Sequence, residues 1–283
     1  MSVEYSKYFI EELKLKKTKL GNMLTEKQIE DAAELLVSAR ISNTIIESIP
    51  LEIRPTSLQD AYAVQDRFIE LLGAKTCGWF GACTNEVIQN LLELDEPYYA
   101  YLLKDHLYQS PAIIDTKKYP PIVFECEFGF VVNRDFLPSG YPYPREIIEE
   151  SIVRVCPTIE IVAGHLKDWP KQDVFSVIAD NGTDGALIIG KGTKNWKGID
   201  LINTPVTLSI NDKVERIGSG ANVLGDPLHA FVWLVNAITR DGKKISAGHV
   251  QNTGTATDIY WAEPGDVAVA DFGSLGRVEL KLD

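Results

Sequence analysis

The 283-residue sequence predicts an α+β fold, in which a helical N-terminal layer precedes a β-rich body. Two observations support this class. Up to about residue 75, apolar residues recur at helical spacing, whereas the later part alternates short apolar runs with turn residues. In addition, the sequence shows no βαβ rhythm with a glycine-rich phosphate loop. We therefore divide the chain into a helical region, 1–75, and a β-rich catalytic-type domain, 76–283.

The helical region contains two sequence signals for the start of a helix. Thr25 to Gln28 matches a capping box, in which a hydroxyl and a glutamine side chain satisfy free backbone amides. A second start lies at Thr56 to Gln59, and Gly73 is a suitable stop for that helix. The Lys- and Glu-rich residues before Met23 are expected to form a loosely held helix or an arm that packs on another subunit.

The β-rich part contains six apolar runs of strand length and one clear helix. Asp226 is the expected N-cap of this helix, Pro227 its first residue, and Asp241-Gly242 its end. The six expected strands are 121–124, 128–132, 158–162, 186–189, 206–210 and 267–270.

Composition limits the partners and the location. The hydrophobic fraction of 45% is that of a globular protein, and the net charge of −12 disfavours nucleic acid as a partner. The charged N-terminal sequence does not resemble a signal peptide, and no stretch approaches the length of a membrane span. The four cysteines form no CxxC pair and are interpreted as reduced thiols. A cytoplasmic protein without membrane contact is therefore expected.

The segment Phe124 to Phe130 carries the first candidate site. Residues two apart in a strand project from the same face, so Glu125 and Glu127 should point together, against an apolar rim of Phe124, Phe128 and Phe130. Two close carboxylates in an apolar setting repel each other and lose hydration, and a divalent cation removes both penalties. Taken alone, the pair is also compatible with a solvent-facing edge strand.

A third carboxylate favours the metal hypothesis. Glu160 lies in the middle of the apolar run 157–162, where an acid needs a partner. Three oxygen ligands suit a hard ion such as Mg²⁺ or Mn²⁺ that keeps open positions for water or substrate. The four histidines are scattered and show no spacing typical of metal ligands.

Two turn-rich segments supply further candidates for substrate binding. Asp180 and Asn181 either orient a metal-bound water or a substrate carboxylate, or form a simple Asx turn. Thr253 and Gly254 lie in a loop whose backbone amides could approach an anionic ligand, although a tight loop without a ligand explains them equally well.

These segments, in this order, resemble the fumarylacetoacetate hydrolase superfamily, with the 2-keto-4-pentenoate hydratase and 4-oxalocrotonate decarboxylase group as the most similar branch. The resemblance runs from about residue 30 to the C-terminus. It implies a mixed β-barrel or β-roll core, a Mg²⁺ or Mn²⁺ cofactor and a homo-oligomer. It also places the metal-binding glutamates of the family on Glu125, Glu127 and Glu160. Seven segments carry it: 95–97, 125–127, 157–162, 179–181, 225–228, 253–255 and 270–276.

Three positions depart from the family pattern. Phe80 stands where hydratases of this branch carry a lysine that reaches the active site, and Tyr98 replaces an aspartate near the substrate. Thr255 replaces a serine. Phe80 and Tyr98 indicate a more apolar pocket and hence a bulkier or less charged substrate. Trp79, beside Phe80, is a further substrate-binding candidate, although a Trp-Phe pair is also typical of core packing. Tyr98 or His249 is a candidate proton donor in place of the lysine, and Thr255 completes the catalytic candidates.

Three functions fit this pattern. The first is a metal-dependent lyase of hydratase or decarboxylase type, acting on a small 2-oxo acid or its enol with altered acid–base residues. The second is a hydrolase or cyclase acting on a β-dicarbonyl compound. The third is a catalytically silent subunit that serves as a binding or scaffolding partner of an active relative.

Overall fold

The computed structural model describes residues 23–119 and 121–283, so the expected N-terminal arm lies outside the described residues. The predicted capping box of the first helix is present, with Thr25 as N-cap. The next helix begins one residue later than expected, because Ser57 rather than Thr56 caps it, and Gly73 ends it in the left-handed conformation. The helices are α2 (Glu26–Ser42), α3 (Leu58–Leu72), α4 (Glu86–Leu92), α5 (Arg145–Ser151), α6 (Val174–Ala179) and α7 (Pro227–Arg240).

In the part of the chain that the structure describes, the larger of two sheets has eight strands in the order β2-β1-β10-β5-β6-β7-β3, with β11 paired to β5 beside this path. It mixes parallel and antiparallel pairs, and its longest pair is β5 with β6. Its strands are β1 (Thr76–Ala82), β2 (Tyr98–Leu103), β3 (Leu107–Gln109), β5 (Val123–Val132), β6 (Ile152–Val162), β7 (Asp184–Ile189), β10 (Val250–Thr255) and β11 (Tyr260–Trp261).

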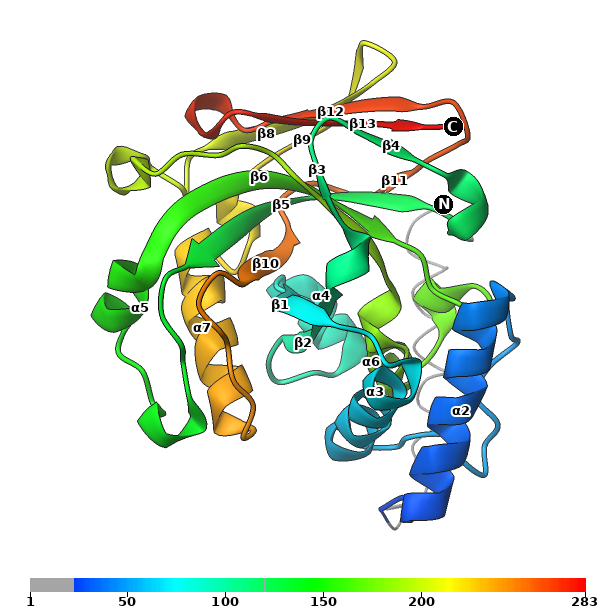
Figure 1. Cartoon of the computed structure of the whole chain (residues 1–283). Helices are drawn as coiled ribbons and strands as arrows, with labels where there is room; N and C mark the ends of the chain where they lie inside the picture. Colours follow the sequence, from blue (N-terminus) through cyan, green and yellow to red (C-terminus); the bar gives the residue numbers. More distant parts are fainter. Residues whose placement is uncertain (1–22, 120) are drawn as a thin grey trace.

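The second sheet has five strands in the order β4-β13-β12-β8-β9. Figure 1 shows it lying across one face of the strongly curved β5–β6 pair, while the helices lie on the other side of that pair. The packing of Phe128 on Phe272 joins the two sheets, with ring centroids 5.1 Å apart. Its strands are β4 (Ala112–Ile114), β8 (Pro205–Ile210), β9 (Lys213–Ser219), β12 (Val267–Asp271) and β13 (Arg277–Leu282).

These arrangements confirm the predicted class, a mixed helical and β fold with a curled, half-barrel sheet. The expected division at residue 75 coincides with the start of β1, but α2 and α3 pack on Leu166 and Ala179 of the later region in one apolar cluster. The domain boundary therefore stays a prediction. No helix of the described residues is long and apolar enough to cross a membrane.

Helix α7 begins as predicted, and its cap provides a test of the fold. The Asp226 carboxylate accepts a hydrogen bond from the backbone N–H of Leu228 at 2.9 Å, and Pro227 occupies the first turn. Asp226→Ala should lower the free energy of unfolding by about 1 kcal/mol, because a free amide loses its partner. Urea denaturation measures the change, and the exposed Glu263→Ala should shift it by less than about 0.5 kcal/mol. Equal stability of both variants would contradict the predicted cap.

Candidate active site

The pairing of β5 with β6 brings three carboxylates together. Glu125 lies directly opposite Glu160 across the antiparallel pair, and Glu127 lies opposite Thr158. Directly opposed residues project from the same face of a sheet, with their Cβ atoms about 5 Å apart. Glu125, Glu127 and Glu160 therefore share one face of the larger sheet. The phenylalanines of β5 lie in the core on the opposite face, which corrects the expected apolar rim around the glutamates.

Burial sets the electrostatics of this cluster. Glu127 and Glu160 are 1% and 4% exposed, while Glu125 is partly exposed. Burial raises the pKa of Glu125 to about 7. Burial first, and then the neighbouring carboxylates, raise the pKa values of Glu127 and Glu160 well above their usual range. The cluster therefore resists carrying three negative charges unless a cation neutralises them.

Backbone and side-chain donors orient two of the three carboxylates. The backbone N–H of Gly254 donates to Glu127 at 2.7 Å, and the Asn252 amide donates to Glu160 at 3.1 Å. A register shift between Asn252 and Thr255 interrupts the pairing of β10 with β5. Such an irregularity turns the Gly254 amide towards the glutamate instead of along the ladder. Gly254 has φ +90° there, and a Cβ would lie 2.1 Å from the Thr84 hydroxyl, so the loop requires glycine.

The donor set fits a hard divalent cation. None of the ion pairs formed by the described residues includes one of the three glutamates, so their negative charge has no basic partner there. Oxygen-only ligands suit Mg²⁺, Mn²⁺ or Ca²⁺. As the side chains stand, however, no group of three or more His, Cys, Asp or Glu in the described part of the chain is arranged to hold a metal ion. The glutamate side chains would have to reorient on binding, and their ligand role stays a prediction.

A cavity of about 820 Å³ opens above the carboxylates, and the three glutamates form part of its wall. Phe80 of β1 and Tyr98 of β2 lie in the same wall, together with Gly254 and Thr255. Burial raises the pKa of the Tyr98 hydroxyl far above its usual value, and negative charge from Glu125 and Glu160 raises it further. The hydroxyl is therefore protonated at neutral pH, and it can donate a hydrogen bond to a substrate oxygen as well as accept one.

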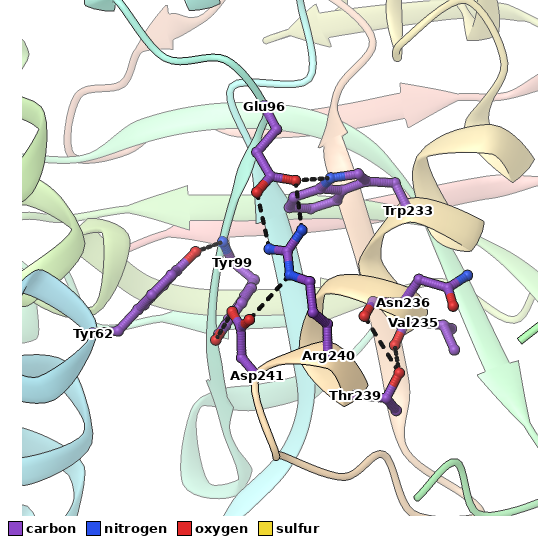
Figure 2. A network of polar contacts seen from close by, with 9 residues as sticks. All are labelled: Tyr62, Glu96, Tyr99, Trp233, Val235, Asn236, Thr239, Arg240 and Asp241. Carbon is purple, nitrogen blue, oxygen red and sulfur yellow. Dashed lines mark hydrogen bonds and ion pairs between the residues drawn. The ribbon is translucent and has the colours of Figure 1, made fainter. Parts of the chain in front are cut away.

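A polar network holds the strand that carries Tyr98. Figure 2 shows Glu96, just before β2, accepting hydrogen bonds from the Trp233 indole and the Arg240 guanidinium of α7. The adjacent Tyr99 donates to Asp241 at 2.9 Å, and its backbone N–H donates to the Tyr62 hydroxyl of α3. Because side chains alternate along a strand, fixing Tyr99 on this side directs Tyr98 into the cavity.

The remaining candidates lie outside the wall of this cavity, so their contact with substrate stays a prediction. Trp79 donates to the Lys244 carbonyl, and Thr253 donates to the Phe128 carbonyl. Asn181 exchanges two hydrogen bonds with the backbone of Tyr101. The Asp180 and His249 side chains are absent from this wall as well. Asp180 accepts from the backbone N–H of His165, and the backbone carbonyl of His249 accepts from Val132.

Sequence reasoning missed several residues of the site. The Asn252 side-chain amide donates to Glu160, and its side-chain oxygen, Oδ1, accepts from the Thr158 hydroxyl at 2.8 Å. Asn252 lies two residues before Gly254, so in a strand the two should share one face, and this spacing could have identified Asn252 from the sequence. Thr84, Asn222, Thr257 and Asp258 also line the cavity. These four lie in connections whose approach to the site depends on long-range pairing.

Comparison with known proteins agrees with this geometry. No protein-family model matches the chain. It is 31% identical over 264 residues to the 2-keto-4-pentenoate hydratase of Paraburkholderia xenovorans (strain LB400), covering 92% of this chain and 97% of the relative. It is 26% identical to the 4-oxalocrotonate decarboxylase of Pseudomonas putida, over 93% of this chain and all of the relative.

Solved structures give the same result. The 4-oxalocrotonate decarboxylase from Pseudomonas putida G7, complexed with magnesium and adipate, superposes with a TM-score of 0.86 at 26% identity, over 93% of this chain and 100% of that chain. A Yersinia pestis CO92 protein assigned to the fumarylacetoacetate hydrolase family shares the fold, with a TM-score of 0.55 and 12% identity over 72% of this chain and 92% of that chain. The chain therefore belongs to the family that contains 2-keto-4-pentenoate hydratase and 4-oxalocrotonate decarboxylase, and it shares the fold of a fumarylacetoacetate hydrolase family protein.

Proposed function

We propose that the chain is a divalent-metal-dependent lyase, of hydratase or decarboxylase type, that acts on a small 2-oxo acid or its enol. One observation carries the proposal: Glu125, Glu127 and Glu160 share one face at the wall of a cavity and have no basic partner among the described residues. A Mg²⁺ or Mn²⁺ ion held there would polarise the oxygens of a 2-oxo acid as a Lewis acid. The magnesium-bound relative supports this assignment.

The other residues of the cavity position substrate and move a proton. Gly254 and Asn252 fix two carboxylates, which pre-organises the negative face of the site. Phe80, which is 2% exposed, and the neighbouring apolar wall exclude water from the reacting carbons. Tyr98 is the proton donor in this assignment. The apolar wall favours a substrate bulkier or less charged than the dienoates of the family.

The direct test is turnover of two substrates by the full chain loaded with Mg²⁺ or Mn²⁺. Water addition to 2-hydroxypenta-2,4-dienoate reports hydratase activity, and release of carbon dioxide from 4-oxalocrotonate reports decarboxylase activity. Metal-dependent conversion of either supports the proposal. Metal binding without any turnover would favour the silent subunit, and cleavage of a β-dicarbonyl compound would favour the hydrolase. The homo-oligomer and the cytoplasmic location expected from the sequence stay predictions.

The proton-donor role of Tyr98 gives a second prediction. Tyr98→Phe should lower kcat by about 10²-fold while KM changes little, because the ring stays in place and only the donor is lost. His249→Gln should leave kcat nearly unchanged, because its side chain lies outside the cavity wall. Steady-state kinetics on whichever substrate turns over separates the two. A large loss in His249→Gln and none in Tyr98→Phe would reverse the assignment.

A further inference from the structure

The cavity above the three glutamates is larger than a small 2-oxo acid requires. Its volume of about 820 Å³ lies in the upper part of the range of about 300–1,000 Å³ that holds drug-sized ligands. Pyruvate and a five-carbon dienoate have far fewer atoms than such ligands. The walls of the remaining space therefore indicate what else the substrate carries.

The wall on the Glu127 side of the glutamate cluster is polar. Gly254 donates its backbone N–H to Glu127, and a Cβ on Gly254 would lie 2.1 Å from the hydroxyl oxygen of Thr84. Thr84 lines the cavity together with Thr255 and Thr257. Hydroxyl groups and a backbone amide thus surround this end of the cavity.

The wall beyond Glu160 is apolar. Val162 follows Glu160 by two residues on β6, about 6.6 Å along the strand, and both residues line the cavity. Two residues later, a Cβ on Gly164 would lie 3.3 Å from the Cβ of Trp169, so Trp169 stands next to the end of β6. The indole nitrogen of Trp169 is buried, so the side-chain surface that Trp169 presents to the cavity is carbon.

Helix α6 completes this apolar wall. Val174 and Val177 both line the cavity, and they belong to one apolar cluster with Tyr98, the proposed proton donor. The two valines are three residues apart, so they lie on one face of the helix. We call the four apolar residues beyond Glu160 the tail pocket: Val162, Trp169, Val174 and Val177.

Two polar side chains of the cavity wall near the tail pocket already use their donor hydrogens within the chain. The amide of Gln172 donates to the backbone carbonyl of Glu47 at 2.9 Å and to that of Lys167 at 2.7 Å. The hydroxyl of Thr183 donates to the Gly182 carbonyl. A carboxylate can only accept hydrogen bonds, so it finds no free donor at either side chain.

The charge of the cavity also disfavours an anionic tail. Among the described residues, no lysine, arginine or histidine lines the cavity, whereas Glu125, Glu127, Glu160 and Asp258 do. The proposed metal ion would be paired with the 2-oxo-carboxylate head of the substrate. A second carboxylate would therefore lose hydration without gaining a cationic partner, while an apolar tail would gain burial.

We propose that the tail pocket binds an apolar group, so that the substrate class is a 2-oxo monocarboxylic acid with an aryl or branched alkyl tail rather than a dicarboxylic 2-oxo acid. The inference rests on the proposed function, because the glutamate cluster places the head of the substrate. The carbon chain then extends past Val162 towards Trp169 and α6. 4-Oxalocrotonate carries a second carboxylate and should be a poorer substrate than such an acid.

Isothermal titration calorimetry on the full chain loaded with Mg²⁺ tests the inference. Pyruvate, phenylpyruvate and 2-oxoglutarate share the 2-oxo acid head and differ in the tail. Phenylpyruvate should bind at least about tenfold more tightly than pyruvate, because its ring is buried, and 2-oxoglutarate should bind no more tightly than pyruvate. If pyruvate binds and the phenyl ring adds no affinity, the inference alone is overturned. If none of the three acids binds, the proposed function fails together with it.

Two substitutions test the location of the tail pocket. Trp169→Ala should weaken phenylpyruvate binding at least about tenfold and leave pyruvate binding nearly unchanged, which also reports an intact site. Val174, the partly exposed first residue of α6, tolerates a longer side chain, and Val174→Arg supplies the missing cation. This variant should bind 2-oxoglutarate at least about tenfold more tightly than phenylpyruvate.

The control for the added charge is Val214→Arg, the same change at an exposed position of β9 that does not line the cavity. It should keep the wild-type order of affinities. Equal losses of pyruvate and phenylpyruvate binding in Trp169→Ala would overturn the inference. The wild-type order of affinities in Val174→Arg would overturn it as well.

Discussion

Replacing Glu160 with glutamine is expected to weaken Mg²⁺ or Mn²⁺ binding by at least about 10²-fold. Loss of a residue that only supports a metal ligand already costs 10- to 100-fold in affinity, and Glu160 is proposed as a ligand itself. The glutamine keeps an oxygen for the Asn252 amide, so the local geometry should persist. Calorimetric titration with each metal measures the loss, and turnover should fall in parallel.

The same substitution should have the opposite effect on the metal-free protein. Burial and the charge of Glu125 disfavour the ionised form of Glu160. Replacing the Glu160 carboxyl with a neutral amide therefore relieves repulsion in the folded state. We expect the Tm of metal-free Glu160→Gln to rise by about 2–4 °C for each kcal/mol relieved, while Mg²⁺ no longer raises it further. Glu279→Gln, an equal charge change at an exposed site, should show neither effect. Unchanged metal affinity in Glu160→Gln would refute the ligand assignment.

Local signals in the sequence predicted much of this fold correctly. The capping box at Thr25 and the start of α7 at Asp226 depend on contacts within four residues, so a single window of sequence contains all the information. The same holds for the shared face of Glu125 and Glu127, which follows from the twofold period of a strand.

Long-range pairing could not be predicted in this way. Nothing in either segment states that Glu125 lies opposite Glu160, because register depends on the whole antiparallel pair. The position of Asn252 beside Glu160 likewise requires β10 to neighbour β5. Both contacts are essential to the proposed site.

Strand alternation separates some neighbouring candidates by face. Trp79 and Phe80 are adjacent in a regular strand, so only one of them can face the cavity, and the structure places Phe80 there. Gly254 and Thr255 are also adjacent, yet both line the cavity. The register shift in β10 accounts for this exception, and such irregularities leave little trace in sequence.

The surroundings of Phe80 decide how the protein should behave towards the substrate of its hydratase relatives. Phe80 packs with Ala100, Leu102 and Leu187, and a Cβ on Gly182 would lie only 2.9 Å from its ring. The resemblance to the family places a proton-transferring lysine at this position. A positioned general acid–base contributes typically 10²–10⁴-fold to a rate, so its loss corresponds to a barrier about 3–5 kcal/mol higher.

Hydration of 2-hydroxypenta-2,4-dienoate requires ketonisation and then addition of water, and each step moves a proton. We therefore expect the unaltered protein, saturated with Mg²⁺, to turn over this dienoate with kcat below ~1 s⁻¹. It should still bind oxalate or pyruvate in the presence of the metal. Phe80→Lys with Tyr98→Asp should raise the rate, because the nearby carboxylates stabilise a buried ammonium, whereas Phe80→Leu should not. A kcat well above ~1 s⁻¹ for the unaltered protein would mean that another group already performs the proton transfer, and the altered chemistry assigned to Phe80 and Tyr98 would be wrong.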